Sequence, residues 1–233
     1  MRLILLSAAL LLGACATTPP TVPNESADQR GIAMITLVDR AVVHAFRTAS
    51  EFASFDNQYP LTWNVSDMLV ESTGATAAVE IALKNTPQWL ANQQNPVSRS
   101  GSGNYVLNRT TAGQIARYCI AQNVGSLIIW LNDNQQRTVQ GGQYALTGNG
   151  AIEIESPGVN PFIAYSSVLG LGVDCQSGRI TAAARDTSLQ RISNFRPPPG
   201  GLPQLELDKT RSYFEQQSQQ LATDLLTQMG LER

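Results

Sequence analysis

The chain has 233 residues and a formal net charge of −2, with 42% hydrophobic and 15% charged residues. This mildly acidic balance argues against a basic surface for nucleic acid, and 6% aromatic residues are too few for a base-stacking or sugar-stacking surface. From residue 31 onward about 200 residues remain, which is enough for one well-packed domain and short for two.

The N-terminal residues have the layout of a secretory signal. Arg2 supplies a positive charge, residues 3–12 are almost entirely apolar, and Gly13 and Ala14 are small. Ten residues of helix rise about 15 Å, which is half of a bilayer core, so the segment is too short for a permanent span. We therefore expect residues 1–14 to be a signal peptide that is removed.

Cys15 follows this segment directly, and Leu12-Gly13-Ala14-Cys15 resembles the lipobox of bacterial lipoproteins. The resemblance implies that the Cys15 sulfur receives a diacylglycerol, that the chain is cut before it, and that the new amino group is acylated. Two or more acyl chains anchor a protein stably where one is marginal. The alternative is a soluble secreted protein whose cysteine lies by chance at the cleavage site.

The residue after Cys15 refines the expected location. In enterobacteria-like sorting an aspartate there favours the inner membrane, whereas this chain has Ala16. The resemblance therefore implies an outer-membrane anchor that faces the periplasm. Residues 15–30 contain three prolines, small polar residues and no apolar periodicity, which predicts a flexible tether. One periplasmic α/β domain is expected at residues 31–233.

Apolar periodicity and turn signals predict the elements of this domain. In chain order we first expect one strand at 32–47, or two strands broken at Asp39-Arg40, then a short hairpin at 48–61, a helix from about Asp67 to Lys84 capped by Asn64 or Ser66, and a loop at 92–109. A helix opened by a Thr111–Gln114 capping box then leads to a buried strand at 127–131. Strands at 143–155, 163–173 and 179–185, with a turn at 175–178, come before a final helix from about Leu207 to Met229 capped by Gly230. This pattern predicts a single α/β domain with a mixed, largely antiparallel sheet, two or three packed helices and a C-terminal amphipathic helix.

Cys119 and Cys175 are the other two cysteines. Because the bacterial periplasm is oxidising, such a pair can form a disulfide there. Cys119 is expected on the Ile115 side of a short helix that packs across the sheet, and Cys175 at the end of a strand. The two can then approach within the Cα separation of about 4.4–6.8 Å that a disulfide requires. Two separate buried thiols are the open alternative, since free cysteine is often buried.

No catalytic, cofactor-binding or metal-binding residue stands out in the chain. The single histidine, His44, lies in an apolar segment, where a strand histidine without catalytic duty is the simpler interpretation. The segment Ser98-Arg-Ser-Gly-Ser-Gly-Asn104 matches neither a nucleophile elbow nor a phosphate-binding loop, and a surface loop explains it. Glu153 and Glu155 lie on one face of a strand, which we expect to be solvated.

Several short motifs of the body resemble a known family. Phe55-x-Asn57, Trp63-x-Val65-x-Asp67 before a helix, and a final helix ending in Met229-Gly230-Leu231 are similar to proteobacterial exported proteins and lipoproteins of unknown function. The order of helix, LIIW strand, hairpin and helix is similar to lipoproteins of the curli-secretion and penicillin-binding-protein-activator type. Neither resemblance supplies catalytic residues.

Two functional hypotheses follow. The first is a lipid-anchored module that docks on a protein partner in the cell envelope, without catalysis. The second is a periplasmic hydrolase or small-ligand-binding protein whose site is assembled from distant residues. A deep pocket that holds His44 beside a serine and a carboxylate favours an enzyme, whereas a shallow surface or an open sheet edge favours docking.

Overall fold

The structure is a computed structural model that describes residues 30–46, 55–61, 63–93, 95–133, 135–139, 142–146, 148–154, 162–193 and 204–233. The expected signal peptide and Cys15 lie outside the described residues, as does the expected tether up to residue 29. Within the described part of the chain, no helix combines the length and the apolar character that a membrane crossing requires.

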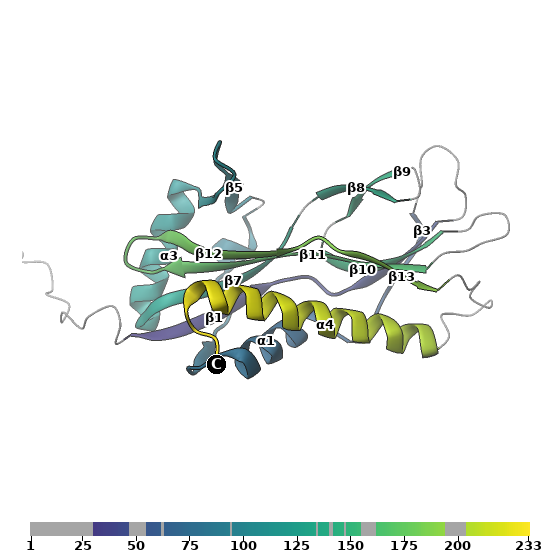
Figure 1. Ribbon diagram of the computed structural model, residues 1–233. Coiled ribbons are helices and arrows are strands. Elements are labelled where there is room, and N and C mark those ends of the chain that lie inside the picture. The colour runs from purple at the N-terminus through teal and green to yellow at the C-terminus, as the bar shows by residue number, and fades with distance from the viewer. Residues whose placement is uncertain are drawn as a thin grey trace, which may run out of the picture.

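The described elements form one mixed α/β fold, which confirms the predicted fold class (Figure 1). The strands are β1 (Gly31–Leu37), β2 (Val42–Phe46), β3 (Phe55–Pro60), β4 (Ile81–Leu83), β5 (Val97–Arg99), β6 (Tyr105–Leu107), β7 (Val124–Asn132), β8 (Gln135–Val139), β9 (Gly142–Leu146), β10 (Gly148–Ile154), β11 (Phe162–Asp174), β12 (Arg179–Asp186) and β13 (Leu189–Ser193). The helices are α1 (Val65–Thr76), α2 (Gln88–Ala91), α3 (Arg109–Gln122) and α4 (Gln204–Met229).

The long strand β11 joins two half-sheets that lie end to end. Residues 168–174 of β11 pair with β7 and β12, whereas residues 162–167 pair with β10 and, over 162–165, with β13. Outside them, β1 pairs in parallel with β7, and β2 pairs in parallel with β10. Figure 1 shows the resulting elongated sheet, with β1 and β7 in one half and β3 and β10 in the other.

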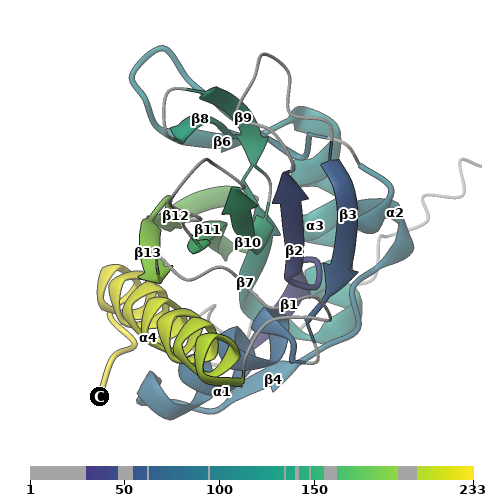
Figure 2. The ribbon, with the colours of Figure 1, turned by 90° about the vertical axis from the view of Figure 1, so that its right-hand side faces the viewer.

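The chain leaves the sheet between β7 and β10. Asn132 of β7 lies opposite Val168, and Gly148 of β10 lies opposite the adjacent Ser167. The described residues between them, 133, 135–139 and 142–146, therefore lie outside one nearly continuous strand. Within this excursion β8 and β9 pair with each other as a separate two-stranded sheet. Figure 2 shows β8 and β9 on one side of the main sheet, with α1 and α4 on the other side.

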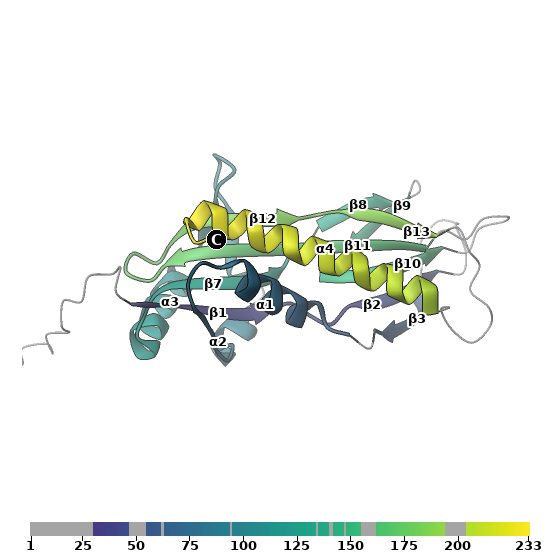
Figure 3. The same cartoon turned by 60° about the horizontal axis from the view of Figure 1, so that its bottom comes forward.

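The two faces of the sheet carry separate cores. Trp130, Val168 and Ala184 face the side covered by α1 and α4, and Phe214 of α4 packs into this core. Figure 3 shows α4 running along the sheet beside the shorter α1. On the opposite face, Ile115 of α3 joins a cluster of strand residues that continues to Leu90 of α2. Burial of side chains on both faces explains why 12 of the 13 residues of β11 are buried.

Several boundaries agree with the sequence-based predictions. The segment 32–47 forms two strands separated at residues 38–41, and the apolar run 127–131 lies inside the buried strand β7. Gly178 (φ +64°) and Gly230 (φ +69°) both adopt the left-handed conformation that their turn and cap positions require.

The predicted helix from Asp67 to Lys84 is wrong in its C-terminal half. Asn64 caps α1 as expected, because its side chain accepts a hydrogen bond from the Ser66 amide, but the helix ends at Thr76. Residues 81–83 instead form β4, which pairs in parallel with β1. The helix stops because the backbone turns to the extended conformation at Ala77 (φ −68°, ψ 136°), and residues 81–83 gain backbone pairing with residues 32–34 of β1 instead.

The predicted capping box at the start of α3 is also wrong. The N-cap is Asn108, whose side-chain oxygen accepts a hydrogen bond from the Thr111 amide at 2.8 Å. The Thr111 hydroxyl donates to the side chains of Asn108 and Gln93 instead of capping a later turn. The expected loop at 92–109 contains the β5–β6 hairpin, and the expected strand at 143–155 is divided into β9 and β10.

Candidate functional site

The candidate site lies where the two half-sheets meet. Three strands of the first half-sheet end here. The chain passes from β1 into β2 through residues 38–41 and from β12 into β13 through residues 187–188, and β7 ends at Asn132. Loop residues at such breaks can carry polar side chains that contact one another or a ligand. We call this level the seam.

Asp39 and Asn132 hold one side of the seam together. The Asn132 side-chain oxygen accepts a hydrogen bond from the Asp39 amide at 3.2 Å, and the Asn132 amide group donates to the Asp39 carboxylate. Gly148 leaves room for the Asn132 side chain, since a Cβ there would lie 2.9 Å from the Asn132 Oδ1. Gly148 also has φ +64°, which disfavours a side chain at the position.

A row of side chains that crosses the strands forms the floor beside the seam. Leu37 of β1 lies opposite Leu131 of β7, Leu131 opposite Leu169 of β11, and Leu169 opposite Arg185 of β12. Leu131 and Leu169 are buried, whereas the Arg185 side chain is 25% exposed. The floor is therefore apolar along three strands and ends in a guanidinium.

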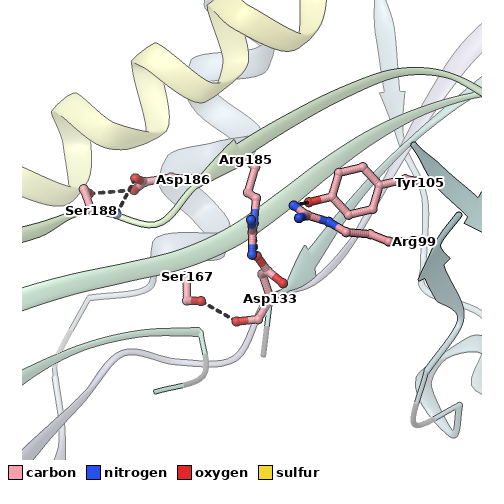
Figure 4. Close-up of polar contacts among 7 residues, drawn as sticks. All are labelled: Arg99, Tyr105, Asp133, Ser167, Arg185, Asp186 and Ser188. Atoms are coloured by element: carbon pink, nitrogen blue, oxygen red, sulfur yellow. Dashed lines mark hydrogen bonds and ion pairs between the residues drawn. The ribbon is translucent and has the colours of Figure 1, made fainter. Parts of the chain in front are cut away.

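Arg185 forms an ion pair with Asp133. Its Nε donates to the Asp133 carboxylate, and the Asp133 side chain is only 15% exposed. The Asp133 backbone is fixed on both sides, because its amide donates to the Ser167 carbonyl at 2.8 Å and its carbonyl accepts from the Ser167 hydroxyl. Figure 4 shows Ser167, Asp133 and Arg185 along this line. The carboxylate therefore has a fixed position at the end of β7.

The β5–β6 hairpin forms the opposite wall. Arg99 of β5 lies over the ring of Tyr105 of β6, with its Cζ 4.9 Å from the ring centroid, and its Nη2 donates to the Tyr105 hydroxyl at 2.7 Å. The Tyr105 hydroxyl is the main cause that raises the pKa of Arg99 above its ordinary value, and the charge of Asp133 contributes least. In Figure 4 the Arg99 guanidinium points toward Arg185 and Asp133.

Together these elements enclose a cleft of about 600 Å³. Its described titratable lining residues are Asp39, Arg99, Tyr105, Asp133 and Arg185. Clefts of about 300–1,000 Å³ are typical of ligand sites. None of the described lining residues is a histidine or a cysteine.

A second polar cluster lies on the opposite face, beneath α4. Asp186 is 8% exposed and accepts hydrogen bonds from the Ser188 amide at 2.8 Å and the Ser188 hydroxyl at 3.0 Å. The Ser188 hydroxyl also contacts the hydroxyl of Tyr213, which lies on α4. This cluster shapes the β12–β13 connection and attaches it to α4, as Figure 4 shows for Asp186 and Ser188.

The residues singled out from the sequence lie mostly away from the cleft. Cys119 and Cys175 are joined by a disulfide with a Cα–Cα distance of 5.7 Å, at the α3 end of the sheet. The backbone of His44 lies in β2 opposite Ile152, but its side chain and that of Glu153 are outside the described part, as are Glu155 and Cys15. Formation of the disulfide in the exported protein stays a prediction.

Of the segments singled out from the sequence, 98–104 is the one that contributes to the cleft. It belongs to the hairpin wall, and Arg99, not a serine, is the residue that reaches Asp133 electrostatically. Asp133 and Arg185 are far apart in sequence and lie in no motif, so only the pairing of β12 and β7 on β11 could have revealed them.

Comparisons with known proteins do not assign the chain to a family. No family model matches it, and no curated protein matches it. Among solved structures, the PelC dodecamer from Paraburkholderia phytofirmans is similar over 88% of this chain and 89% of that chain, with 9% identity and a TM-score of 0.35.

Two further solved structures show likeness of the same order. A protein from Xanthomonas campestris described by the family model DUF330 is similar over 86% of this chain and 84% of that chain, at 10% identity and a TM-score of 0.36. A hypothetical protein from Chlamydia trachomatis is similar over 86% and 95%, at 11% identity and a TM-score of 0.35. At these scores no functional residue is carried over to this chain.

Proposed function

We propose that this chain is a lipid-anchored accessory protein of the cell envelope that docks on a partner protein through the cleft at the seam. The lipobox resemblance at Cys15 supports the anchor, and Ala16 supports the outer membrane, facing the periplasm, as its location. A protein held by its lipid at one end of a tether meets partners of the same membrane at high effective concentration.

The observation that carries the docking proposal is the composition of the cleft. Its aspartates are already paired, Asp133 with Arg185 and Asp39 with Asn132, so they are arranged as fixed recognition groups. Polar groups that are held in place before binding favour specific recognition, because less side-chain entropy is lost in the complex.

Site-specific photo-crosslinking tests this function. A photoreactive residue is placed at Ser98, an exposed serine of the cleft lining, and in a matched variant at Ser212, an exposed serine of α4. In intact cells we expect a crosslinked product of defined mass from position 98 and none from position 212. The product should fall when Arg185 is replaced by Gln. An identical product from both positions, or none from position 98, would refute docking through the cleft.

Binding of a small molecule is the second candidate function, and the volume of about 600 Å³ favours it. Native mass spectrometry of the protein extracted gently from the envelope separates the two candidates. A bound small molecule that disappears in the Arg185→Gln variant would support ligand binding, whereas a ligand-free protein that still crosslinks at position 98 supports docking.

A further inference from the structure

We propose that the cleft recognises a carboxylate, which binds between the guanidinium groups of Arg99 and Arg185. This inference rests on the proposed function, since it names the chemical group that the cleft takes from its partner. The two arginines come from opposite sides of the cleft, Arg99 from the β5–β6 hairpin and Arg185 from β12 of the main sheet (Figure 4).

The charges at this end of the cleft leave a positive surplus. Arg99 and Arg185 share one carboxylate, since Asp133 is ion-paired with Arg185 and is also the carboxylate whose charge acts on Arg99. Asp39 instead accepts a hydrogen bond from Asn132. Asp39 stays charged, so the described cleft lining is balanced as a whole, with Asp39 and Asp133 against Arg99 and Arg185. The positive surplus is local to the two arginines that share Asp133. An anion is therefore favoured over a cation between the two guanidinium groups.

Both guanidinium groups keep donors available for a ligand. An arginine carries five N–H donors in a planar fork. Arg185 uses its Nε for Asp133, and Arg99 uses its Nη2 for the Tyr105 hydroxyl. Among the described residues neither arginine has a further hydrogen-bond partner, so the terminal N–H groups of Arg185 and the Nε and Nη1 of Arg99 remain for an incoming oxyanion.

Both arginines are also oriented before a ligand arrives. The Tyr105 ring and hydroxyl hold Arg99, and Asp133, whose backbone is bonded to Ser167, holds Arg185. A carboxylate accepts two parallel N–H bonds from one guanidinium edge, and a second guanidinium can donate to its remaining lone pairs. Such a carboxylate would also relieve the repulsion between two cations that point toward one another. A cationic ligand would add to this repulsion.

The carboxylate can belong to an acidic side chain of a partner protein or to a small molecule. We commit to the partner, because the Arg99 side of the cleft is exposed at Ser98 and Arg99, where a protein surface can reach it. An acetylated tetraglutamate peptide represents this source, citrate represents a small-molecule source, and a tetralysine peptide is the charge-reversed control.

The experiment follows the Nε–Hε NMR signals of Arg99 and Arg185 during titration of the disulfide-bonded protein at constant ionic strength. Assignments come from Arg99→Gln and Arg185→Gln, and Arg211→Gln is the matched control. Arg211 has a similar Nε contact, 2.8 Å to Glu215, but on the exposed surface of α4. We expect saturable shifts at both cleft arginines and about a tenfold to hundredfold weaker binding in each cleft variant.

The result distinguishes this inference from the proposed function. Arginine-dependent binding of the glutamate peptide supports a partner carboxylate, and arginine-dependent binding of citrate alone supports a small-molecule carboxylate. Absence of saturable binding by both probes overturns the inference. Equal loss in Arg211→Gln overturns it as well, because the effect would then be nonspecific. If crosslinking at position 98 succeeds while the titrations fail, docking stands and the carboxylate assignment falls. Since Arg99 is exposed, its variant keeps the test independent of folding.

Discussion

Replacing Gly170 by Ala should destabilise the fold strongly, because Trp130 occupies the space of the missing side chain. A Cβ at Gly170 would lie 2.2 Å from Cζ3 of the Trp130 ring and 2.8 Å from both Cε3 and Cη2. Ordinary contacts of a Cβ begin near 3.4 Å, so the ring must move by more than about 1 Å. Trp130 is fully buried, and a close-packed core resists such a shift.

The expected cost follows from overpacking. Added methyl groups in packed cores cost about 1–3 kcal/mol, and we expect Gly170→Ala to reach about 3 kcal/mol. For a chain of this size that loss lowers the melting temperature by about 6–12 °C. The matched control is Gly113→Ala in α3, where a Cβ meets nothing within 4 Å. Because alanine favours helix, this control should gain about 0.5–1 kcal/mol.

Urea unfolding followed by circular dichroism measures both variants. A double-mutant cycle with Trp130→Leu then isolates the steric contact, since removing the ring should cut the cost of Gly170→Ala by more than half. A loss below about 1 kcal/mol for Gly170→Ala would refute the packing argument, as would an equal loss with and without the Trp130 ring.

Three further predictions concern the cysteines and one tyrosine. Replacing both Cys119 and Cys175 by Ser should lower the free energy of unfolding by about 4 kcal/mol, which is the chain-entropy value for a loop of this length. Alkylation of the unfolded, unreduced wild type tests the bond itself, and two alkylatable thiols would show that no bond forms. Cys15→Ser should release the protein from the membrane fraction or leave it uncut, and a processed variant in the outer-membrane fraction would contradict the lipid anchor. Burial raises the pKa of Tyr118, whose hydroxyl donates to the Asn85 carbonyl, so the folded state holds the phenol proton more tightly and stability falls as pH rises through the tyrosine range. Tyr118→Phe should be less stable at neutral pH and lose less stability at alkaline pH; an equal alkaline loss in both proteins would contradict this assignment.

The long buried elements of the fold were predictable from apolar pattern. The apolar run at 127–131 indicated β7, and the largely apolar segment at 163–173 indicated β11, because many consecutive residues carry the signal. The strands β4, β5 and β6 have three residues each, which is too short for a period to emerge. Helix starts failed where competing caps were close together, since Asn108 precedes Thr111 by one helical turn.

The site could not be predicted because its contacts depend on strand pairing. Asp39 and Asn132 are 93 residues apart, and Asp133 and Arg185 are 52 residues apart. Each is an ordinary polar residue at the end of an apolar segment, and nothing in the local sequence states which strand lies opposite. The need for glycine at 148 became clear only from the structure, where a positive φ and the nearby Asn132 side chain both favour it.

The position of β11 has a consequence for how the chain is made. Synthesis proceeds from the N-terminus, so β1 with β7 and β2 with β10 can pair before residues 162–174 exist. The strand that pairs with both β7 and β10 is then still missing. Until then the edges of β7 and β10 that will receive β11 are open to other chains. Nascent chains that stop before residue 162 should therefore aggregate or be degraded, and chaperones should be needed most during this interval. We expect the risk to fall once β11 has paired with both β7 and β10.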